Sequence, residues 1–96
     1  MRVTSYDSVS VTLGWREVNC ANYSVEYALL NKEGCEDFTN PDYSLHCMCS
    51  GTNVTVISGL MANSMYNMRV KAYVDGNYGP EDEVDVTTST QSKHLW

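Results

Sequence analysis

The residues best suited to chemistry in this chain are four cysteines and two histidines. Three cysteines and one histidine lie close together in the sequence and could form a zinc-ligand set: Cys35, His46, Cys47 and Cys49. The Cys-x-Cys spacing is tighter than that of structural zinc sites, and a second ligand pair is missing. We therefore expect no metal, and we interpret His46 as an ordinary exposed strand residue.

Catalysis finds little support in the remaining residues. A nucleophile needs a base within hydrogen-bond reach, and a third group must orient that base. His94 lies among the last residues of the chain, so His46 is the one histidine left for this role. Gly76 and Gly79 belong to a turn sequence between two predicted strands and not to a phosphate-binding loop. The sequence therefore predicts a protein that is not an enzyme and that holds no cofactor.

Acidic residues form one run, Glu81-Asp82-Glu83 with Asp85, in a chain of net charge −6. The run lacks the spacing of a calcium loop. We interpret it as a solvated strand start that discourages edge pairing, with steering of a basic partner as the alternative. Only six residues are basic, which argues against nucleic acid or an anionic membrane surface as the partner.

The cysteine count and two glycosylation motifs both indicate an oxidising compartment. An even number of cysteines in a small domain is typical of disulfides. The motifs Asn22-Tyr23-Ser24 and Asn53-Val54-Thr55 make Asn22 and Asn53 candidate glycosylation sites. No apolar run approaches the ~18 residues that cross a bilayer. Since no leader-like segment follows Met1, we expect a module of a longer extracellular or cell-surface protein.

Apolar and polar residues alternate along much of the chain, and no segment has a helical apolar stripe. Turn sequences separate the alternating segments, which predicts an all-β sandwich or barrel. The clearest predicted strands cover residues 9–15, 23–27, 54–57, 66–74 and 84–87. We expect one domain over residues 1–90, followed by a linker or disordered tail at 91–96.

Tyr66 opens the longest alternating segment, directly after a turn-like segment that begins at Leu60. A tyrosine in this place is typical of the tyrosine corner of Greek-key sandwiches. In that corner the ring packs in the core, and the hydroxyl binds a backbone group a few residues upstream. Tyr66 is therefore predicted to fasten one sheet to the other.

These motifs together resemble a fibronectin type III domain from about Val3 to Thr90. The second strand of that family is matched by Val11-Thr12-Leu13-Gly14-Trp15 and the third by Tyr23-Ser24-Val25-Glu26-Tyr27. The resemblance implies an immunoglobulin-like Greek-key β-sandwich of about seven strands. We expect its core to hold the large side chains of Trp15, Tyr23, Tyr27, Leu60 and Tyr66.

The chain departs from the family between residues 31 and 51, where the family has a short connection and one strand. A turn at Asn40-Pro41 would set Cys35 opposite Cys47. The usual strand order would bring Cys49 close to Cys20. Cys47 and Cys49 are two residues apart, and a bridge between them would be badly strained, which removes one of the three possible connectivities. We therefore expect the disulfides Cys35–Cys47 and Cys20–Cys49, which would staple the insertion.

Loops at the ends of a sandwich vary without disturbing its core, so binding concentrates there. We expect partner contacts at Asn77 and Tyr78 in the glycine-rich turn, and at Phe38 and Tyr43 in the insertion. The alternative is that these rings merely cover the sheet or are incidentally exposed.

The resemblance implies an extracellular protein-binding or spacer module of a multidomain adhesion or receptor-type protein. Its partner would be another extracellular protein. One alternative is a cytokine-receptor-like ectodomain module, although the tryptophan-serine repeat of that subfamily is missing here. Others are a non-binding accessory module of a secreted enzyme, or a free-thiol module of a large intracellular protein.

Overall fold

The computed structural model describes residues 1–19, 21–31 and 41–90. The strands in these ranges are β1 (Arg2–Tyr6), β2 (Val11–Gly14), β3 (Asn22–Asn31), β4 (Ser44–Ser50), β5 (Val54–Ile57), β6 (Met65–Val74) and β7 (Asn77–Thr87). Residues 32–40 of the predicted insertion and the predicted tail at 91–96 lie outside the described residues. The all-β prediction is confirmed. The sequence pattern had not identified β4.

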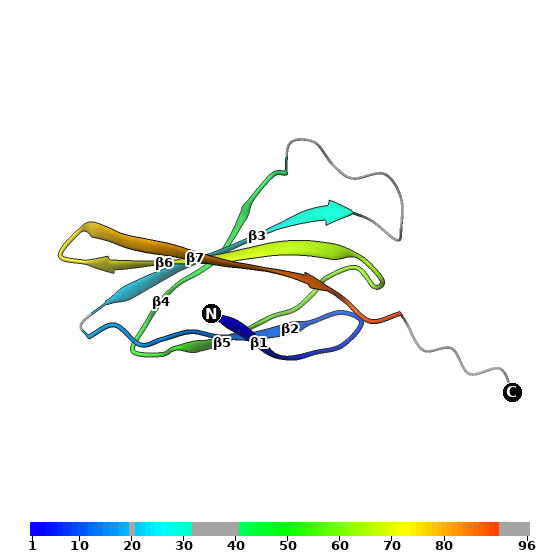
Figure 1. Cartoon of the computed structure of the whole chain (residues 1–96), viewed down its shortest axis with the longest axis horizontal. Helices are drawn as coiled ribbons and strands as arrows, with labels where there is room; N and C mark the ends of the chain where they lie inside the picture. Colours follow the sequence, from blue (N-terminus) through cyan, green and yellow to red (C-terminus); the bar gives the residue numbers. More distant parts are fainter. Residues whose placement is uncertain (20, 32–40, 91–96) are drawn as a thin grey trace, which may run out of the picture.

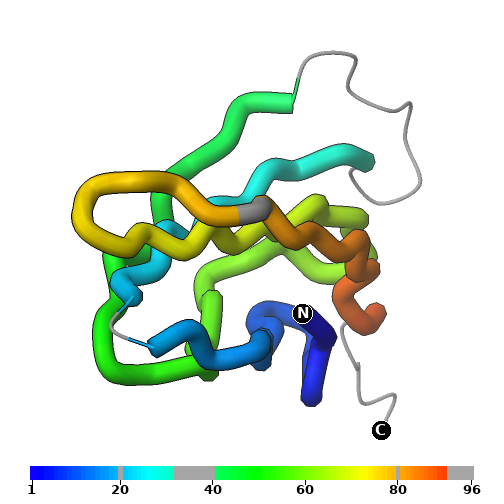
Figure 2. Tube along the Cα trace, turned by 60° about the vertical axis from the view of Figure 1, so that its left-hand side comes forward, coloured from blue at the N-terminus to red at the C-terminus, as the bar shows by residue number. Residues whose placement is uncertain are grey.

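The strands form two antiparallel sheets that pack face to face (Figure 1). One sheet has the order β1-β2-β5 and the other the order β4-β3-β6-β7. The chain passes from one sheet to the other after β2, after β4 and after β5, so it alternates between the two layers (Figure 2). This arrangement confirms the predicted Greek-key sandwich of about seven strands.

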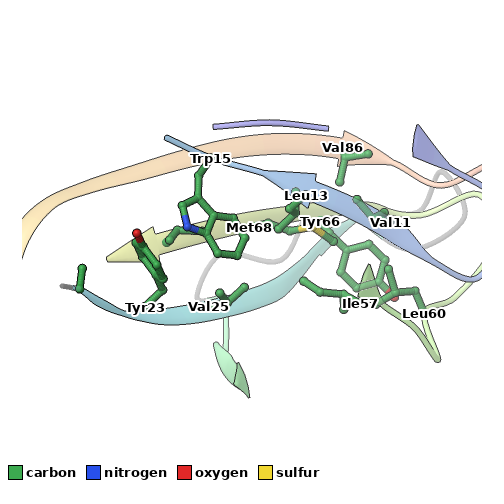
Figure 3. Close-up of a cluster of buried hydrophobic side chains, with 12 residues drawn as sticks. Val11, Leu13, Trp15, Tyr23, Val25, Ile57, Leu60, Tyr66, Met68 and Val86 are labelled. Carbon is green, nitrogen blue, oxygen red and sulfur yellow. The ribbon is translucent and has the colours of Figure 1, made fainter. Parts of the chain in front are cut away.

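The core lies between the sheets because inward-facing residues of both layers are apolar (Figure 3). Its buried residues come from every strand except β1 and β4, and from the loops at the ends: Val11, Leu13, Trp15, Ala21, Tyr23, Val25, Ile57, Leu60, Tyr66, Met68, Val70 and Val86. Tyr27, which we also expected in the core, is half-buried and packs against this cluster. Each large side chain buried in this way stabilises the fold by about 1.5–3 kcal/mol.

Tyr66 makes the predicted corner. Its ring is 4% exposed, and its hydroxyl accepts a hydrogen bond from the backbone N–H of Met61 at 2.8 Å. The hydroxyl of Thr88, just after β7, donates to the carbonyl of Met61 at 2.6 Å. Both backbone groups of Met61 thus have partners, as backbone groups in a protein interior require. The two bonds fasten the loop before β6 to the end of β7.

A second tyrosine fastens the other end of the sandwich. Tyr23 is 2% exposed, and its hydroxyl accepts from the N–H of Val18 at 2.7 Å. The same hydroxyl lies 3.2 Å from the carbonyl oxygen of Val18 and donates to it. The ring of Trp15 packs on Tyr23 with centroids 5.3 Å apart and planes tilted by 60° (Figure 3). At each end of the core, a tyrosine hydroxyl thus forms a hydrogen bond with the backbone.

The disulfide prediction is wrong in its pairing. The structure joins Cys47 to Cys49 within β4, and each sulfur forms one bridge. The predicted pairs Cys35–Cys47 and Cys20–Cys49 therefore do not form, and Cys20 and Cys35 themselves lie outside the described residues.

A bulge lies directly before the two bridged cysteines, and their Cα atoms are closer together than in a regular strand. Two residues apart in a regular strand, Cα atoms are about 6.6 Å apart. Register with β3 shifts between Val25, which faces Cys47, and Glu26, which faces Leu45. His46 is thus an extra residue in β4, and the Cα atoms of Cys47 and Cys49 lie 5.5 Å apart. That separation falls within the usual range for disulfides.

Candidate protein-docking surface

The predicted binding residues lie in separate parts of the sequence. Asn77 and Tyr78 follow the β6–β7 turn, whose central residues Asp75 and Gly76 have φ values of 53° and 78°. Two consecutive positive φ values are typical of the tight type I′ turn. Tyr43 lies just before β4, and Phe38 lies outside the described residues. The Asn77–Tyr78 segment is therefore the first part of a strand in a rigid hairpin, where we had expected a loop.

Tyr43 and Tyr78 share one surface, the outer face of the four-stranded sheet. Alternate residues of β6 point outward on this face and connect them. At one end Tyr43 contacts Asn67 and Arg69, and at the other end Tyr78 contacts Lys71 and Tyr73. We call this set the tyrosine row: Tyr43, Asn67, Arg69, Lys71, Tyr73 and Tyr78. The alternation of β6 had already assigned its polar members to one side, but not to a site.

The Tyr43 end of the row is held by hydrogen bonds and stacking. The Tyr43 hydroxyl donates to Oδ1 of Asn67 at 2.6 Å, and Nδ2 of Asn67 donates to Oδ1 of Asp85 at 2.7 Å. The guanidinium carbon of Arg69 lies 3.6 Å from the centre of the Tyr43 ring, while its Nε donates to Glu26 at 3.1 Å. These contacts order the side chains before any partner binds, which reduces the entropy lost on binding.

The ion pair with Glu26 favours the charged form of Arg69. Burial disfavours the charged form of Arg69, but the hydrogen bond and the negative charge of Glu26 outweigh it and raise the pKa of Arg69. Arg69 therefore stays a cation and remains stacked on Tyr43 at any physiological pH. Stacked arginine and tyrosine are frequent anchors of protein interfaces.

The Tyr78 end is more open. Tyr78 is 62% exposed, yet its ring lies 3.9 Å from that of Tyr73 and 5.5 Å from Nζ of Lys71. A hydrogen bond with Tyr78, together with desolvation, raises the pKa of Tyr73 to about 12. Lys71 also pairs with Glu81 at 3.3 Å. An exposed aromatic ring is therefore presented in a fixed position.

Metal-ligating side chains do not gather among the described residues, and a hollow lies away from the tyrosine row. Within residues 1–19, 21–31 and 41–90, no cluster of three or more metal-ligating side chains forms. His46 lies away from the row, with Nε2 3.0 Å from the hydroxyl of Thr55. A hollow of about 370 Å³ lies near Gly14 on the three-stranded sheet, between Arg2 and Arg16. None of the described residues belongs to a helix able to cross a membrane.

The other predicted site residues lie outside the row. Asn22 is exposed at the start of β3. Asn53 is also exposed, but its Nδ2 donates to the carbonyl of Trp15 at 3.1 Å. The acidic run lies within β7, at one edge of the four-stranded sheet, and not at the strand start where we expected it. Asp82 in this run pairs with the amino group of Met1.

Comparison with solved structures identifies the fold. The third fibronectin III domain of human KIAA0343 protein superposes with a TM-score of 0.76 at 16% identity, over 96% of this chain and 80% of that one. The fn3 domain of human contactin 1 gives 0.71 at 17% identity, over 96% and 76%. The FN5 domain of Drosophila Lar gives 0.67 at 19%, over 94% and 91%. The chain therefore has the fibronectin type III fold.

Sequence comparison adds nothing to this likeness. No protein-family model matches the chain, and no curated protein matches it significantly. The fold hosts many functions, so the function must be argued from the surface of this chain.

Proposed function

We propose that this chain is an extracellular protein-binding module of a multidomain adhesion or receptor-type protein. In this proposal the tyrosine row is its docking surface, and another extracellular protein is its partner. The module performs no chemistry. The sandwich acts as a rigid support, and the row supplies the aromatic and cationic contacts.

The observation that carries the proposal is the setting of Tyr78. This ring is 62% exposed, although Tyr73 and Lys71 hold it from two sides. Fixed, exposed aromatic side chains lose little entropy when a partner covers them. Tyrosine and arginine are also the residue types enriched at the centres of protein interfaces.

Two features support the extracellular setting. The Cys47–Cys49 disulfide is of the kind that persists in oxidising compartments. Asn22 and Asn53, the asparagines of the glycosylation motifs, are both exposed and therefore able to carry glycans.

The proposal is tested by screening the protein against a panel of extracellular domains, with three variants beside the parent chain. We expect Tyr78→Ala to weaken any specific interaction by at least about tenfold, a typical hot-spot loss. Tyr43→Ala should weaken it as well, because it removes the ring on which Arg69 stacks.

Tyr6→Ala is the matched control, since Tyr6 is a similarly exposed tyrosine at 55% and lies on the other sheet. This variant should bind as the parent does. A confirmed interaction that survives both row variants and is lost in Tyr6→Ala would place the docking surface elsewhere.

A further inference from the structure

Two of the six basic residues of this chain lie together without an acidic partner. Arg69 and Lys71 form ion pairs on the four-stranded sheet, and two lysines lie outside the described residues. The remaining two, Arg2 and Arg16, form no ion pair with any carboxylate of the described residues. Both line the hollow of about 370 Å³ on the three-stranded sheet. The unpaired cations of the described part therefore meet at one cavity.

The hollow exists because a glycine stands in the middle strand of this sheet. Gly14 of β2 pairs with Arg2 of β1 on one side and with Val54 of β5 on the other. Paired residues share one face of a sheet, and here it is the outer face, since the neighbouring Leu13 is buried in the core. Arg2 and Val54 therefore flank a position that has no side chain. A Cβ at this position would lie 3.3 Å from Cγ2 of Thr4, so a larger residue would fill the floor of the hollow.

Two hydrogen bonds fix the segment that carries Arg16. The N–H of Trp15 donates to the carbonyl of Asn53 at 3.0 Å, and Nδ2 of Asn53 donates to the carbonyl of Trp15 at 3.1 Å. The side chain of Trp15 is 8% exposed, so the chain directly before Arg16 is anchored in the core. Arg16 follows Gly14 by two residues, the spacing that returns an extended chain to the same face. The two arginines thus border the hollow from two different segments of a fixed backbone.

We propose that this hollow binds a small ligand that carries a carboxylate, sulfate or phosphate group. Arginine matches the geometry of such oxyanions and binds them through two parallel hydrogen bonds. Because no described carboxylate engages Arg2 or Arg16, both guanidinium groups are available to the ligand. The net charge of −6 repels anions over the rest of the surface, so binding depends on this local pair.

The other lining residues indicate the remainder of the ligand. The hydroxyl of Thr4 and Nδ2 of Asn53 already donate to backbone carbonyls, so their oxygen atoms are left to accept hydrogen bonds from hydroxyl groups of the ligand. Val54 adds an apolar wall. A volume of about 370 Å³ lies at the lower end of the range for small-molecule sites. The ligand is therefore a single hydroxylated unit, such as one sugar ring that bears an acidic group.

This site is separate from the tyrosine row. The row lies on the outer face of the four-stranded sheet, whereas the hollow lies on the outer face of the three-stranded sheet. A partner docked on the row would therefore leave the hollow open, and the two sites can be tested independently.

A nuclear magnetic resonance titration of the labelled full chain tests the proposal. The chain is made without glycans, because Asn53 lines the hollow. The probes are glucuronate, glucose 6-sulfate and glucose 6-phosphate at equal ionic strength, with glucose as the neutral control. We expect saturable amide shifts at Gly14, Arg16 and Val54 with at least one anion, at a Kd of about 1 mM, and none with glucose. The anion that binds most tightly identifies the acidic group.

Three variants connect the binding to the hollow. Arg2→Gln/Arg16→Gln should weaken it by at least about tenfold, because both guanidinium groups are lost. Gly14→Ala keeps both arginines but places a methyl group on the floor, and it should also weaken binding. Lys32→Gln/Lys93→Gln is the matched control, since it removes the same positive charge elsewhere in the sequence and should bind as the parent does.

Four results would overturn the proposal. The first is that none of the three anions shifts the amides around the hollow, and the second is that glucose shifts them as strongly. The third is that the double arginine variant binds as the parent chain does. The fourth is that the double lysine variant loses as much binding as the double arginine variant.

Discussion

The two edges of the four-stranded sheet avoid strand addition in different ways. β7 carries four carboxylates at Glu81, Asp82, Glu83 and Asp85. β4 carries no charge, and its regular backbone is interrupted by a bulge and a disulfide. Charge repels any acidic chain at a distance, whereas an irregular backbone prevents hydrogen bonding only on contact. An acidic chain that approaches β7 is therefore repelled by its carboxylates, whereas no charge opposes side-chain contacts at β4.

The largest expected effect comes from removing the disulfide in β4. Cys47→Val/Cys49→Val removes the bridge, which contributes about 1.6 kcal/mol for a three-residue ring in the loop-entropy model. It also leaves an uncharged strand of high β-propensity at a sheet edge, the pattern of an aggregation site. We expect a lower urea midpoint and light scattering that increases with concentration.

A double valine variant that stays as soluble as the parent chain would show that the bridge does not protect β4. The double serine variant at Cys47 and Cys49 is the matched control. It loses the same bridge but presents polar side chains, so its stability should fall similarly with less aggregation.

A smaller effect should follow when β7 loses part of its charge. Glu81→Thr/Glu83→Thr removes two carboxylates and the ion pair with Lys71, which is partly exposed and contributes at most about 1 kcal/mol. Asp82 and Asp85 remain. We expect a nearly unchanged melting temperature and weak self-association at low salt. If this variant aggregates more than the double valine variant, the ranking of the two edges is reversed.

The outer face between the edges can be probed by titration. Tyr73 has its pKa raised to about 12, first by the hydrogen bond with Tyr78. In Tyr78→Phe this pKa should fall toward its usual value of about 10. Ultraviolet absorbance of tyrosinate, followed from pH 8 to pH 12.5 in parent and variant, measures the change. An unaltered titration of Tyr73 would mean that the two hydroxyls are not bonded.

The smallest effect concerns a carboxylate that belongs to neither edge. Asp7 accepts hydrogen bonds from the N–H groups of Val9 and Ser10 and from the Ser10 hydroxyl, which lower its pKa. Because the folded pKa lies below the unfolded one, this stabilisation is complete above about pH 4 and is lost as pH falls further.

Asp7→Asn should therefore flatten the acid side of the melting temperature profile slightly, below about pH 4. The change isolates the turn carboxylate, because the four carboxylates of β7 are unaltered in this variant. If the profile of the variant coincides with that of the parent chain down to pH 2, the hydrogen bonds of Asp7 do not contribute to stability.

The two sheets and the Tyr66 corner could be predicted from the sequence because both depend on local patterns. Alternation defines a buried strand face wherever it occurs, and Tyr66 follows its turn at the spacing that a corner requires. The second tyrosine, Tyr23, was expected only as a core ring, although its hydroxyl binds the backbone of Val18 five residues upstream, the same separation as between Met61 and Tyr66.

The edge strand β4 and the site were harder to predict. An extra residue at His46 breaks the alternation of β4, so a search for alternating residues does not find this strand. The Cys47–Cys49 bridge was rejected because the sequence does not show the 5.5 Å separation of their Cα atoms. Tyr43 and Tyr78 were each identified singly. They come together in one row only in the folded chain, because strand pairing places β6 between them.

The most direct test of the docking surface is a nuclear magnetic resonance map of the labelled chain with a partner found by the screen. The account predicts that the amide shifts concentrate on β6 and β7 around Arg69, Lys71 and Tyr78. Shifts confined to β1, β2 and β5, with Tyr78 unchanged, would contradict it.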